Sequence, residues 1–434
     1  MKTLVVGAGA TGIAVARFLA RAGDRVVLTD RADKRAIPDD LRGNVELVLG
    51  EHRLSDFTGA DRIVLSPGVD PRGPELTAAR ARGVPVTGEI ELASAHVHGT
   101  LLAITGTNGK STATSLLGAI CAATGRPTFV GGNLGTPLVS AINTPALAPG
   151  GFCVLELSSY QLETCVTLRP HVAVLLNLTP DHLDRYDSMA GYGAAKARIF
   201  GAQTAEDFAV VHGDDAACVA LATGHASRLV ALPPPTDAEL VLPLPAGEEH
   251  FPTADLALVG RHNLQNAAAS YAAARLAGVP PEAVRAGARG FRPLDHRMQL
   301  VGEARGVRYF DDSKGTNVDA VVASVRGFPT PYVLICGGRD KGGSYAPLAE
   351  AVRGRARGVV LLGEAAPLIE AALGDAAPHE RASSMDDAVR RAASLARPGD
   401  AVLLSPACSS FDMFTDYKDR GRRFQAAVAA LACE

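Results

Sequence analysis

The stretch ITGTNGKSTATSLLGAI, residues 104–120, decides the fold class of this chain. It follows the apolar run Leu101–Ile104, which predicts a strand, and its own apolar end predicts a helix. Small residues between a strand and a helix, closed by Gly-Lys-Ser, are typical of a phosphate-binding loop. The usual pattern requires a glycine at position 104, yet this chain has isoleucine there and its first glycine is Gly106.

The loop Thr105–Ser111 still offers the groups that a nucleoside triphosphate needs. Its small residues present backbone N–H groups, Lys110 supplies charge for the β- and γ-phosphates, and Ser111 supplies a hydroxyl for Mg²⁺. A glycine turn with a surface lysine is the alternative interpretation. The strand before the loop and the helix after it favour a nucleotide site.

Around this loop, short apolar strands alternate with alanine-rich helical stretches. That alternation is the βαβ pattern of parallel sheets, so we expect an α/β protein. Its 434 residues exceed one ordinary core, and about two to four domains are expected. We expect three: a Rossmann-like domain at 1–93, a P-loop-type ATPase domain with a parallel sheet at 94–295, and a second Rossmann-like domain at 296–434.

A helix is expected to follow Gly260–Asn263 and to run to about Leu276. The proline-rich stretch 232–245 predicts a loop or an excursion from the sheet, and residues 292–297 predict a hinge. The expected strands are Thr3–Val6, Arg25–Thr29, Asp61–Leu65, Leu101–Ile104, Phe152–Leu157, Val172–Asn177, Phe208–His212, Arg308–Phe310, Tyr332–Cys336, Gly358–Leu362 and Ala401–Ser405.

The composition excludes several classes of function. With 47% hydrophobic and 21% charged residues, the chain is globular rather than disordered. Its net charge of -3 and its lack of tryptophan argue against a nucleic-acid partner. We see neither a signal-peptide layout nor an apolar run long enough for membrane insertion. The seven scattered cysteines form no Cys-x-x-Cys pair, so we expect no zinc site and a reducing cytoplasm.

A second glycine-rich turn, Gly7–Gly12, follows the first expected strand and opens a helix. Asp30, at the end of the next strand, stands where the acid that binds a ribose belongs. Glycine amides at a helix N-terminus favour a diphosphate. Alone, this pattern suits NAD or FAD, and it also suits the diphosphate and ribose of a UDP-sugar. A tight turn without a ligand is the remaining alternative.

Polar residues gather at the ends of other expected strands, where α/β folds place ligand groups. Glu156 is a candidate Mg²⁺ ligand, and in the cluster Asn177–Asp184, His182 could bind a metal or orient a substrate. An exposed strand-end acid and a turn rich in helix caps are the alternatives. Lys196, on spacing alone, would be an ordinary surface lysine of a helix.

Three polar loops follow expected strands of the third domain: Asp311–Asn317, Gly337–Lys341 and Ser405–Asp412. We expect them to share one crevice, with lysines and hydroxyls that suit an anionic substrate. No histidine stands out as a partner for Cys408, which we expect to be a small packing residue rather than a nucleophile.

Together these motifs resemble the Mur ligases, the ATP-dependent enzymes that build the peptide of bacterial cell-wall precursors. The resemblance covers the whole chain in order. Thr105–Ser111 looks like that family's own phosphate loop, in which the early glycine is missing. The other matching stretches are Glu156–Leu162, Asp181–Tyr186, Lys196, His262–Ala267 and His296–Arg297.

Within the family, Asp312–Asn317 and Ser405–Asp412 resemble the branch whose amino-acid substrate is D-glutamate. The Asp-Asn-Pro-Arg motif expected of the diaminopimelate-adding branch is missing, and Asn108 stands where the alanine-adding branch usually has histidine. The resemblance implies an enzyme that adds D-glutamate to UDP-N-acetylmuramoyl-L-alanine with ATP and Mg²⁺, as a cytoplasmic monomer. The segment after Asp30 matches poorly, and Tyr417 stands where the family often has phenylalanine.

The resemblance also implies roles at matching positions. Lys110, His182 and Lys196 would be catalytic, and Lys196 would be carbamylated, which turns its ammonium into a carboxylate-like group. The metal ligands would be Ser111, Glu156, His182 and Lys196. The ATP contacts would be Gly106, Thr107, Asn108, Gly109, Lys110, Ser111, Thr112, Asn263, Asn266, Arg297 and Asp312. The UDP-substrate contacts would be Gly9, Thr11, Asp30, Ser66, Gly68, Asn133, Ser159 and Gln161. The D-glutamate contacts would be Lys314, Thr316, Lys341, Ser410 and Phe411.

Three rival functions stay open at this point. One is another amino-acid ligase of the same family. A second is a nicotinamide-dependent oxidoreductase built on Gly7–Gly12 and Asp30, which leaves the Lys110 loop and both later domains unexplained. A third is a non-catalytic nucleotide-binding protein, in which Glu156, His182 and Lys196 would have no reason to accompany that loop.

Overall fold

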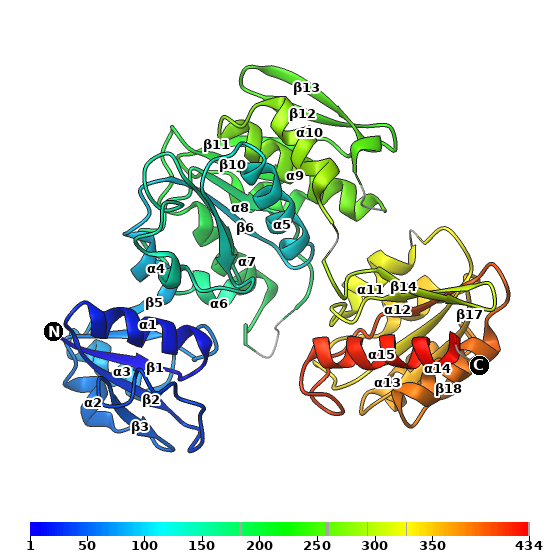
Figure 1. Cartoon of the computed structure of the whole chain (residues 1–434), viewed down its shortest axis with the longest axis horizontal. Helices are drawn as coiled ribbons and strands as arrows, with labels where there is room; N and C mark the ends of the chain where they lie inside the picture. The colour runs from blue at the N-terminus through cyan, green and yellow to red at the C-terminus, as the bar shows by residue number, and fades with distance from the viewer. Residues whose placement is uncertain (182–184, 257–259, 293, 327, 433–434) are drawn as a thin grey trace. The chain divides into compact units, whose positions relative to one another are not determined.

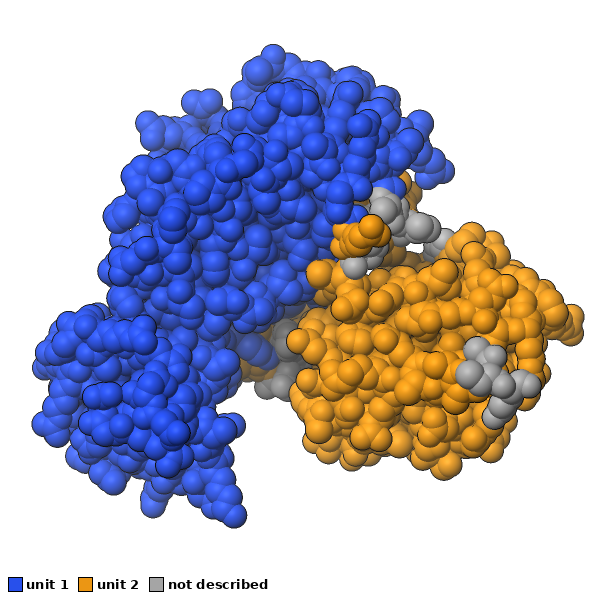
Figure 2. All heavy atoms as spheres, in the orientation of Figure 1, with its two compact units in different colours: residues 1–178, 190–256, 265–291 blue, residues 179–189, 257–264, 292–434 orange. Residues whose placement is uncertain are grey.

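The computed structural model describes residues 1–181, 185–256, 260–292, 294–326 and 328–432 (Figure 1). The chain divides into two compact units (Figure 2). Unit 1 comprises residues 1–178, 190–256 and 265–291, and unit 2 comprises residues 179–189, 257–264 and 292–434. No helix in the described part of the chain is long and apolar enough to cross a membrane.

The first sheet of unit 1 is parallel, with the strand order β3-β2-β1-β4-β5 of a Rossmann fold. Helix α1 packs closely on it because Gly12 has no side chain: a Cβ there would lie 1.8 Å from the Gly7 carbonyl oxygen. The strands are β1 (Lys2–Val6), β2 (Arg25–Asp30), β3 (Glu46–Leu49), β4 (Arg62–Leu65) and β5 (Val86–Gly88), and the helices are α1 (Ala10–Arg21), α2 (Leu54–Thr58) and α3 (Pro74–Ala81).

The second sheet of unit 1 is also parallel, in the order β11-β10-β9-β6-β8-β7. Ile104 is fully buried in β6 and pairs with Glu156 and Val174, so this position is strand interior and not part of the loop. The strands are β6 (Thr100–Thr105), β7 (Thr128–Gly132), β8 (Phe152–Glu156), β9 (Val172–Leu175), β10 (Phe208–His212) and β11 (Arg228–Leu232). The helices are α5 (Lys110–Ala122), α6 (Ser159–Leu162), α7 (Met189–Ala197), α8 (Ala216–Ala222), α9 (Arg261–Leu276) and α10 (Pro281–Gly290).

The proline-rich stretch after β11 is an excursion from the central sheet, the second of the two predicted alternatives. Its second half is strand β12 (Glu239–Leu244), which pairs antiparallel with β13 (Gly247–Pro252) in a separate two-stranded sheet. Leu240 and Leu242 are fully buried, so the strand has an apolar face. Pro243 fits because both strands of such a sheet are edge strands, which tolerate a residue without an N–H group.

The sheet of unit 2 has the order β14-β15-β19-β16-β17-β18, with β14 antiparallel and the other strands parallel. One hydrophobic cluster packs α11, α12 and α13 on one face, and another packs α14 and α15 on the opposite face. The strands are β14 (Gln299–Ala304), β15 (Val307–Asp311), β16 (Tyr332–Gly337), β17 (Ala356–Leu362), β18 (His379–Arg381) and β19 (Ala401–Leu404). The helices are α11 (Val318–Arg326), α12 (Ala346–Val352), α13 (Ala366–Leu373), α14 (Met385–Leu395) and α15 (Tyr417–Ala432).

The predicted α/β class, the parallel sheets and the helix after Gly260 are confirmed. The predicted strand Val172–Asn177 ends two residues early, at Leu175, which leaves Asn177 in the loop beyond β9. Between α10 and β14, residues 292–297 contain no helix or strand in the positions that the structure describes, and the hinge there stays a prediction.

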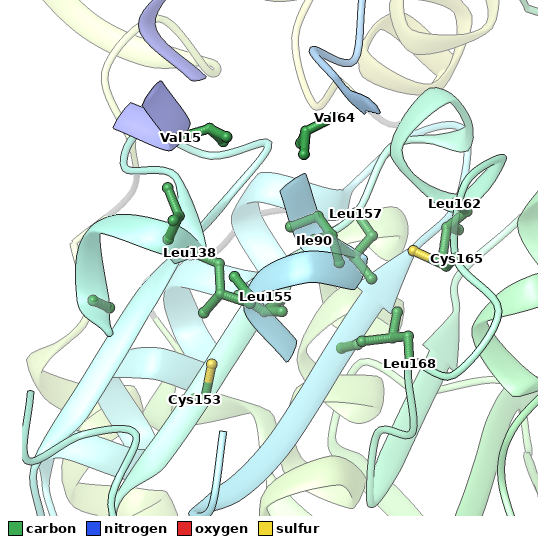
Figure 3. Packing of buried hydrophobic residues seen from close by; sticks show 14 of the residues in the cluster. Val15, Val64, Ile90, Leu138, Cys153, Leu155, Leu157, Leu162, Cys165 and Leu168 are labelled. Atoms are coloured by element: carbon green, nitrogen blue, oxygen red, sulfur yellow. The ribbon is translucent and has the colours of Figure 1, made fainter. Parts of the chain in front are cut away.

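Helix α4 (Glu89–Ser94) links the two sheets of unit 1, because it follows β5 directly and also contacts α6 of the central part. Its Ile90 is buried in one hydrophobic cluster with Val15 of α1, Leu157, and Leu138 of the 3-10 helix η1 (Leu138–Ala141) (Figure 3). The N-terminal sheet and the central sheet therefore share part of their core.

Two carboxylates of α4 add polar contacts between the N-terminal sheet and the central sheet. Glu91 accepts hydrogen bonds from three consecutive backbone N–H groups, Val166–Leu168, at 2.7 to 3.2 Å. Glu89 is 2% exposed, and its Oε1 accepts a hydrogen bond from the Val139 N–H at 2.7 Å. Its Oε2 is buried and has no hydrogen-bond partner among the described residues.

Glu89 should make the stability of unit 1 depend on pH. Burial raises the pKa of its carboxyl from 4.5 to about 7, against the hydrogen bonds from the N–H groups of Val139 and Leu138. The pKa of Glu89 is higher in the folded protein than in the unfolded chain. The contribution of its protonated carboxyl to the free energy of unfolding is therefore complete below about pH 4.5 and is lost as the pH rises through about 7. We expect Glu89→Gln, which mimics the protonated acid, to stabilise the protein by on the order of 3 kcal/mol at about pH 8 and by much less at about pH 5.

Thermal unfolding followed by circular dichroism at both pH values measures this effect. The matched control is Glu303→Gln, because Glu303 is an exposed strand glutamate. It should shift the unfolding midpoint little at either pH. A Glu89→Gln variant whose midpoint shift is the same at both pH values would contradict the assignment.

Candidate active site

The predicted phosphate loop lies between β6 and α5, at the carboxyl edge of the central sheet. Only Gly106–Gly109 separate the strand from the helix. Gly109 has a φ of 84°, and a Cβ there would lie 2.2 Å from Oδ1 of Asn266 in α9. A glycine is therefore required at this position. The structure brings two predicted ATP contacts, Gly109 and Asn266, together.

Two lysine side chains converge on one carbonyl of this loop. Lys110 Nζ donates hydrogen bonds to the Gly106 oxygen at 3.0 Å and to the Thr107 oxygen at 2.7 Å. Lys196 Nζ donates to the same Gly106 oxygen at 2.7 Å and lies 4.6 Å from the centre of the Tyr192 ring. Because Lys196 is 1% exposed, the interpretation as an ordinary surface lysine is wrong. Both side chains therefore reach the phosphate loop, where the Lys110 ammonium suits a phosphate chain.

Glu156 ends β8 beside this loop, since it pairs with Ile104 of β6. It is 2% exposed, and its Oε1 accepts a hydrogen bond from Asn133 Nδ2 at 2.6 Å. Its Oε2 has no hydrogen-bond partner within the described ranges. A buried carboxylate oxygen without a donor is unfavourable unless a cation completes it.

The donors at this edge fit Mg²⁺. Ser111, in the first turn of α5, offers a hydroxyl oxygen, and Glu156 offers the unpaired carboxylate oxygen. Mg²⁺ takes few protein oxygens and completes its shell with water and substrate phosphates. In the parts of the chain that are described, no three His, Cys, Asp or Glu side chains could hold a metal by themselves. His182, the other predicted histidine ligand, lies outside the described residues.

Asp30 binds its own glycine turn. Its Oδ2 accepts a hydrogen bond from the Ala8 N–H and its Oδ1 from the Ala32 N–H, both at 2.8 Å, and Arg35 Nε lies 3.1 Å from Oδ2. Burial opposes the ionisation of Asp30, but these hydrogen bonds and the Arg35 charge outweigh it and lower the pKa. Asp30 therefore closes the turn as an anion, a structural task that the sequence pattern does not show.

The other predicted UDP-substrate contacts come from both sheets of unit 1. Ser66, after β4, and Gln161, in α6, line one hollow that Glu89 also lines. Gln161 Oε1 is already an acceptor for the Ser158 N–H at 3.0 Å. The remaining contacts lie at the start of α1, which has no side-chain cap (Gly9 and Thr11), in the exposed turn after β4 (Gly68), and at the start of α6 (Ser159).

In unit 2, the three predicted polar loops meet. Strands β15, β19 and β16 are neighbours in that order, so the loops after them leave the same edge of the sheet. Ser405 Oγ donates a hydrogen bond to Asp312 Oδ2 at 2.6 Å. Arg339 and Ser409 exchange backbone hydrogen bonds at 2.9 and 3.1 Å. The prediction that these loops lie together is confirmed.

The predicted D-glutamate contacts sit on these loops. Lys314 Nζ lies 4.1 Å from the centre of the Tyr417 ring, so this tyrosine positions the ammonium group. The Thr316 N–H donates a hydrogen bond to the Lys314 carbonyl at 2.8 Å. Ser410 is buried, whereas the neighbouring Phe411 is 64% exposed. An exposed phenylalanine beside cations and hydroxyls is available to contact a ligand.

Asp181 ties a segment from the central part of the sequence to these loops. Its Oδ2 accepts a hydrogen bond from Asn317 Nδ2 at 3.2 Å, and its Oδ1 lies 4.0 Å from Lys341 Nζ. Lys341 is therefore held next to the segment that leads into His182. Sequence reasoning gave Asp181 no role, and the separation of 136 residues between Asp181 and Asn317 explains why.

Three predicted ATP contacts also come close together in unit 2. Burial raises the pKa of Asp312 to about 6, opposed by the Ser405 hydrogen bond and the charge of Arg297. Burial lowers the pKa of His262, and Arg297 lowers it further. Arg297 thus lies near both Asp312 and the start of α9, where Asn263 follows His262.

Cys408 lies below the third loop as a buried thiol. It is fully buried, and its Sγ is 3.1 Å from the Tyr345 hydroxyl oxygen. Burial raises the pKa of the thiol to about 11, so it is protonated at neutral pH. The geometry supports the expectation of a packing residue.

Arg420 of α15 is a residue that sequence reasoning missed. It is 1% exposed, and its Nε donates a hydrogen bond to Ser313 Oγ at 3.0 Å. Its Nη2 donates to the carbonyls of Ser313 and Cys408 at 2.9 and 3.2 Å, which fastens the loop after β15 to the loop after β19. One signal was available: Arg420, Phe424 and Val428 follow the four-residue spacing of a buried helix stripe.

Arg420→Met is expected to lower the free energy of unfolding by about 3 kcal/mol, because it leaves buried carbonyls of Ser313 and Cys408 without donors. Urea unfolding followed by fluorescence or circular dichroism measures this. Arg422→Met is the matched control on the same helix, since the Arg422 side chain is 63% exposed and pairs with Asp419 only at 3.9 Å. Equal unfolding midpoints for both variants would show that the buried hydrogen bonds contribute nothing.

Family models and curated relatives match the chain along its length. The Mur ligase MurD-like N-terminal domain matches residues 1–88, the Mur ligase middle domain residues 104–274, and the Mur ligase glutamate ligase domain residues 296–408. A UDP-N-acetylmuramoylalanine--D-glutamate ligase of Geobacter metallireducens is 47% identical over 99% of this chain and 97% of its own. A ligase of the same name from Anaeromyxobacter dehalogenans is 46% identical over 98% and 96%.

Solved structures share the fold. A pseudomurein peptide ligase type C from Methanothermus fervidus aligns with a TM-score of 0.63 and 17% identity, covering 98% of this chain and 99% of its own. A UDP-N-acetylmuramate-alanine ligase from Thermotoga maritima aligns with a TM-score of 0.60 and 19% identity, covering 99% of each chain. At these identities the likeness concerns the fold alone.

Proposed function

The chain belongs to the Mur ligase family, and from this premise we propose that it joins D-glutamate to UDP-N-acetylmuramoyl-L-alanine with ATP, in the synthesis of peptidoglycan precursors. The full-length likeness to ligases of that activity supports the proposal. In the structure, the observation that carries it is the convergence of Lys110 and Lys196 on the Gly106 carbonyl, at the sheet edge that also holds the unpaired Glu156 oxygen. A nicotinamide-dependent oxidoreductase would need neither the two lysines at this loop nor the buried Glu156 carboxylate beside it.

The reaction needs an activated carboxylate, because forming an amide from a free carboxylate is uphill in water. The alanine carboxylate attacks the γ-phosphorus of ATP, ADP leaves, and an acyl phosphate forms. The neutral amine of D-glutamate then attacks the acyl carbon, inorganic phosphate leaves with the bonding pair, the nitrogen releases one proton, and the neutral amide remains. The acyl phosphate must be kept from water until the amine arrives.

Residues at the carboxyl edge of the central sheet would serve the phosphoryl transfer. Lys110 and the N–H groups of the first turn of α5 would hold the β- and γ-phosphates. Ser111 and Glu156 would hold one Mg²⁺, and His182 with a carbamylated Lys196 would hold a second. When bound, Mg²⁺ neutralises charge on the phosphates and the attacking carboxylate. The proposed ATP contacts outside the loop are Asn263, Asn266, Arg297 and Asp312.

The loops of unit 2 would bind D-glutamate. Its two carboxylates need cations and hydroxyl donors, and the loops carry Lys314, Lys341, Thr316 and Ser410. The family models support a division of labour in which residues 1–93 bind the UDP part, 94–295 bind ATP, and 296–434 bind the amino acid.

We also propose that the enzyme acts as a monomer in the cytoplasm, without a nucleic-acid partner. The six cysteines among the described residues are free and buried, which suits a reducing compartment. ATP and a nucleotide-linked substrate are both available there.

The deciding experiment is phosphate release from ATP in the presence of UDP-N-acetylmuramoyl-L-alanine and a panel of D- and L-amino acids. Release that depends on D-glutamate is the expected result. Release with another amino acid would keep the ligase mechanism and overturn the assignment of the loops at Asp312 and Ser410. No release with any amino acid would overturn the proposed function.

A further inference from the structure

Asn177 lies two residues beyond Leu175, the last residue of β9, and pairs with the backbone of the phosphate loop. Its Oδ1 accepts a hydrogen bond from the Asn108 N–H at 2.8 Å, and its Nδ2 donates to the Asn108 carbonyl at 3.0 Å. Its own carbonyl accepts from the Thr107 N–H at 3.1 Å. Before it, the Leu176 N–H donates to the Thr105 carbonyl at 3.0 Å. Leu176 and Asn177, which follow β9, thus form hydrogen bonds with Thr105, Thr107 and Asn108 of the loop.

This pairing decides which backbone N–H groups can face a phosphate. The N–H groups of Thr107 and Asn108 both point at Asn177. The next N–H groups belong to Gly109 and to the first turn of α5, which begins at Lys110. The first N–H groups of a helix have no acceptor within the helix. The anion-binding set is therefore expected to begin at Gly109 and not earlier.

The side chain of Asn177 also sets the direction of the Gly109 N–H. The Asn108 carbonyl and the Gly109 N–H belong to one planar trans peptide, so they point in opposite directions. Since the carbonyl is held by Asn177 Nδ2, the Gly109 N–H must point away from Asn177. Gly109 then continues into α5 with a φ of 84°, and Asn266 leaves no room for a side chain at this position.

A short loop needs such an outside support. Because β6 continues through Ile104 and Thr105, only four residues, Gly106–Gly109, connect it to α5. Two of these are glycines with positive φ, which the chain does not hold rigid by itself. Asn177 supplies three of the contacts that fix the remaining two, Thr107 and Asn108.

We propose that Asn177 is a positioning residue for ATP: its side-chain amide holds the Asn108–Gly109 peptide so that the N–H groups from Gly109 onward face the terminal phosphates. This inference rests on the proposed use of ATP at the loop. This role needs both ends of the Asn177 amide: Oδ1 accepts from the Asn108 N–H, and Nδ2 donates to the Asn108 carbonyl.

Asn177→Ala removes both side-chain contacts, and we expect kcat/KM for ATP to fall by about tenfold to a hundredfold. The KM values for D-glutamate and for the UDP-linked substrate should change by less than about twofold, because the loop serves the phosphates. Asn177→Asp keeps the acceptor but places a carboxylate oxygen against the Asn108 carbonyl. It should impair ATP use in the same way, and it serves as the second variant if Asn177→Ala folds poorly.

The matched control is Asn44→Ala. Asn44 is an exposed asparagine in the N-terminal sheet region whose Nδ2 also donates to a backbone carbonyl, that of Asp40, at 3.0 Å. It should leave the kinetic constants for all three substrates unchanged. Thermal unfolding of each variant shows whether the fold survives.

Amide hydrogen exchange tests the geometry without any catalytic assay. In the full-length wild-type protein, the N–H groups of Thr107 and Asn108 should exchange slowly, and in Asn177→Ala the Asn108 N–H should exchange at least about tenfold faster. The N–H of Ala113, bonded within α5 to the Gly109 carbonyl, should keep its protection in both.

Each outcome is decisive. Rapid exchange of the Asn108 N–H in the wild type, or unchanged kcat/KM for ATP in both Asn177 variants, would overturn the positioning role. Equal losses for all three substrates would also overturn it and show a general structural role. A wild-type protein with slow Asn108 exchange but no ATP-dependent ligation would leave the loop geometry standing and refute the proposed function instead.

Discussion

Replacing Lys110 with alanine is expected to lower kcat/KM for ATP by about a thousandfold or more while the protein stays folded. Lys110 Nζ lies 2.7 Å from the Thr107 oxygen and 3.0 Å from the Gly106 oxygen, at the mouth of the phosphate loop. In the transfer step, negative charge spreads over the γ-phosphoryl oxygens. A fixed cation there stabilises the transition state more than it stabilises bound ATP.

The size of this effect can be compared with the cost to the fold. A thousandfold loss corresponds to about 4 kcal/mol of transition-state stabilisation. The same substitution removes two hydrogen bonds to loop carbonyls from a partly buried side chain, a loss of about 1 to 3 kcal/mol in stability. Catalysis should therefore fail in a protein that still unfolds cooperatively.

ADP release at varied ATP concentration measures the kinetic change. Lys2→Ala is the control, because Lys2 is the first residue of β1 in the N-terminal sheet and its side chain, 27% exposed, pairs with Asp56 at 3.4 Å. That variant should keep kcat/KM within about twofold of the wild type. A Lys110→Ala variant within about tenfold of the wild type would refute the assignment of this loop as the ATP site.

Local sequence patterns were sufficient for most of the fold. Apolar runs of β-branched residues mark both the five-stranded and the six-stranded sheets, since buried parallel strands need them on both faces. Ile104 illustrates this: its place in β6 follows from the apolar run before it, and it explains the missing glycine. The patterns left the stretch 232–245 open between a loop and an excursion, and the pairing of β12 with β13 and the buried Leu240 and Leu242 decide for the excursion.

Site residues were predictable where strand ends place them and not where distant partners do. Glu156 and the loops of unit 2 follow strands, so parallel topology alone gathers them at one edge of each sheet. Lys196 bonds to a carbonyl 90 residues away, and Arg420 bonds to Ser313 across 107 residues. Helical spacing shows which side of a helix a residue is on, but not what packs against that side. For this reason, helical spacing alone predicted Lys196 to be a surface lysine, and only the family resemblance gave it a role in the site.

Lys196→Ala is expected to lose ligation in ordinary buffer by about a thousandfold and to recover part of it when acetate or propionate is added. Lys196 is 1% exposed, with the Tyr192 ring and the Gly106 carbonyl beside its Nζ. Truncation would leave a cavity in that place. If the working group is a carbamate, a small carboxylate can enter the cavity and supply the missing anionic oxygens to Mg²⁺.

Lys196→Arg separates an anionic from a cationic role. Arginine keeps the positive charge and fills the space, but it is always protonated and forms no carbamate. We therefore expect this variant to be inactive and not to be rescued by acetate, because no cavity exists. If Lys196 acted as an ammonium group, Lys196→Arg would keep measurable activity. Methylamine, rather than acetate, would then restore Lys196→Ala. Sodium chloride at equal ionic strength controls for salt effects. Rescue by the amine alone would refute the carbamate and leave Lys196 as a second cation of the phosphate loop.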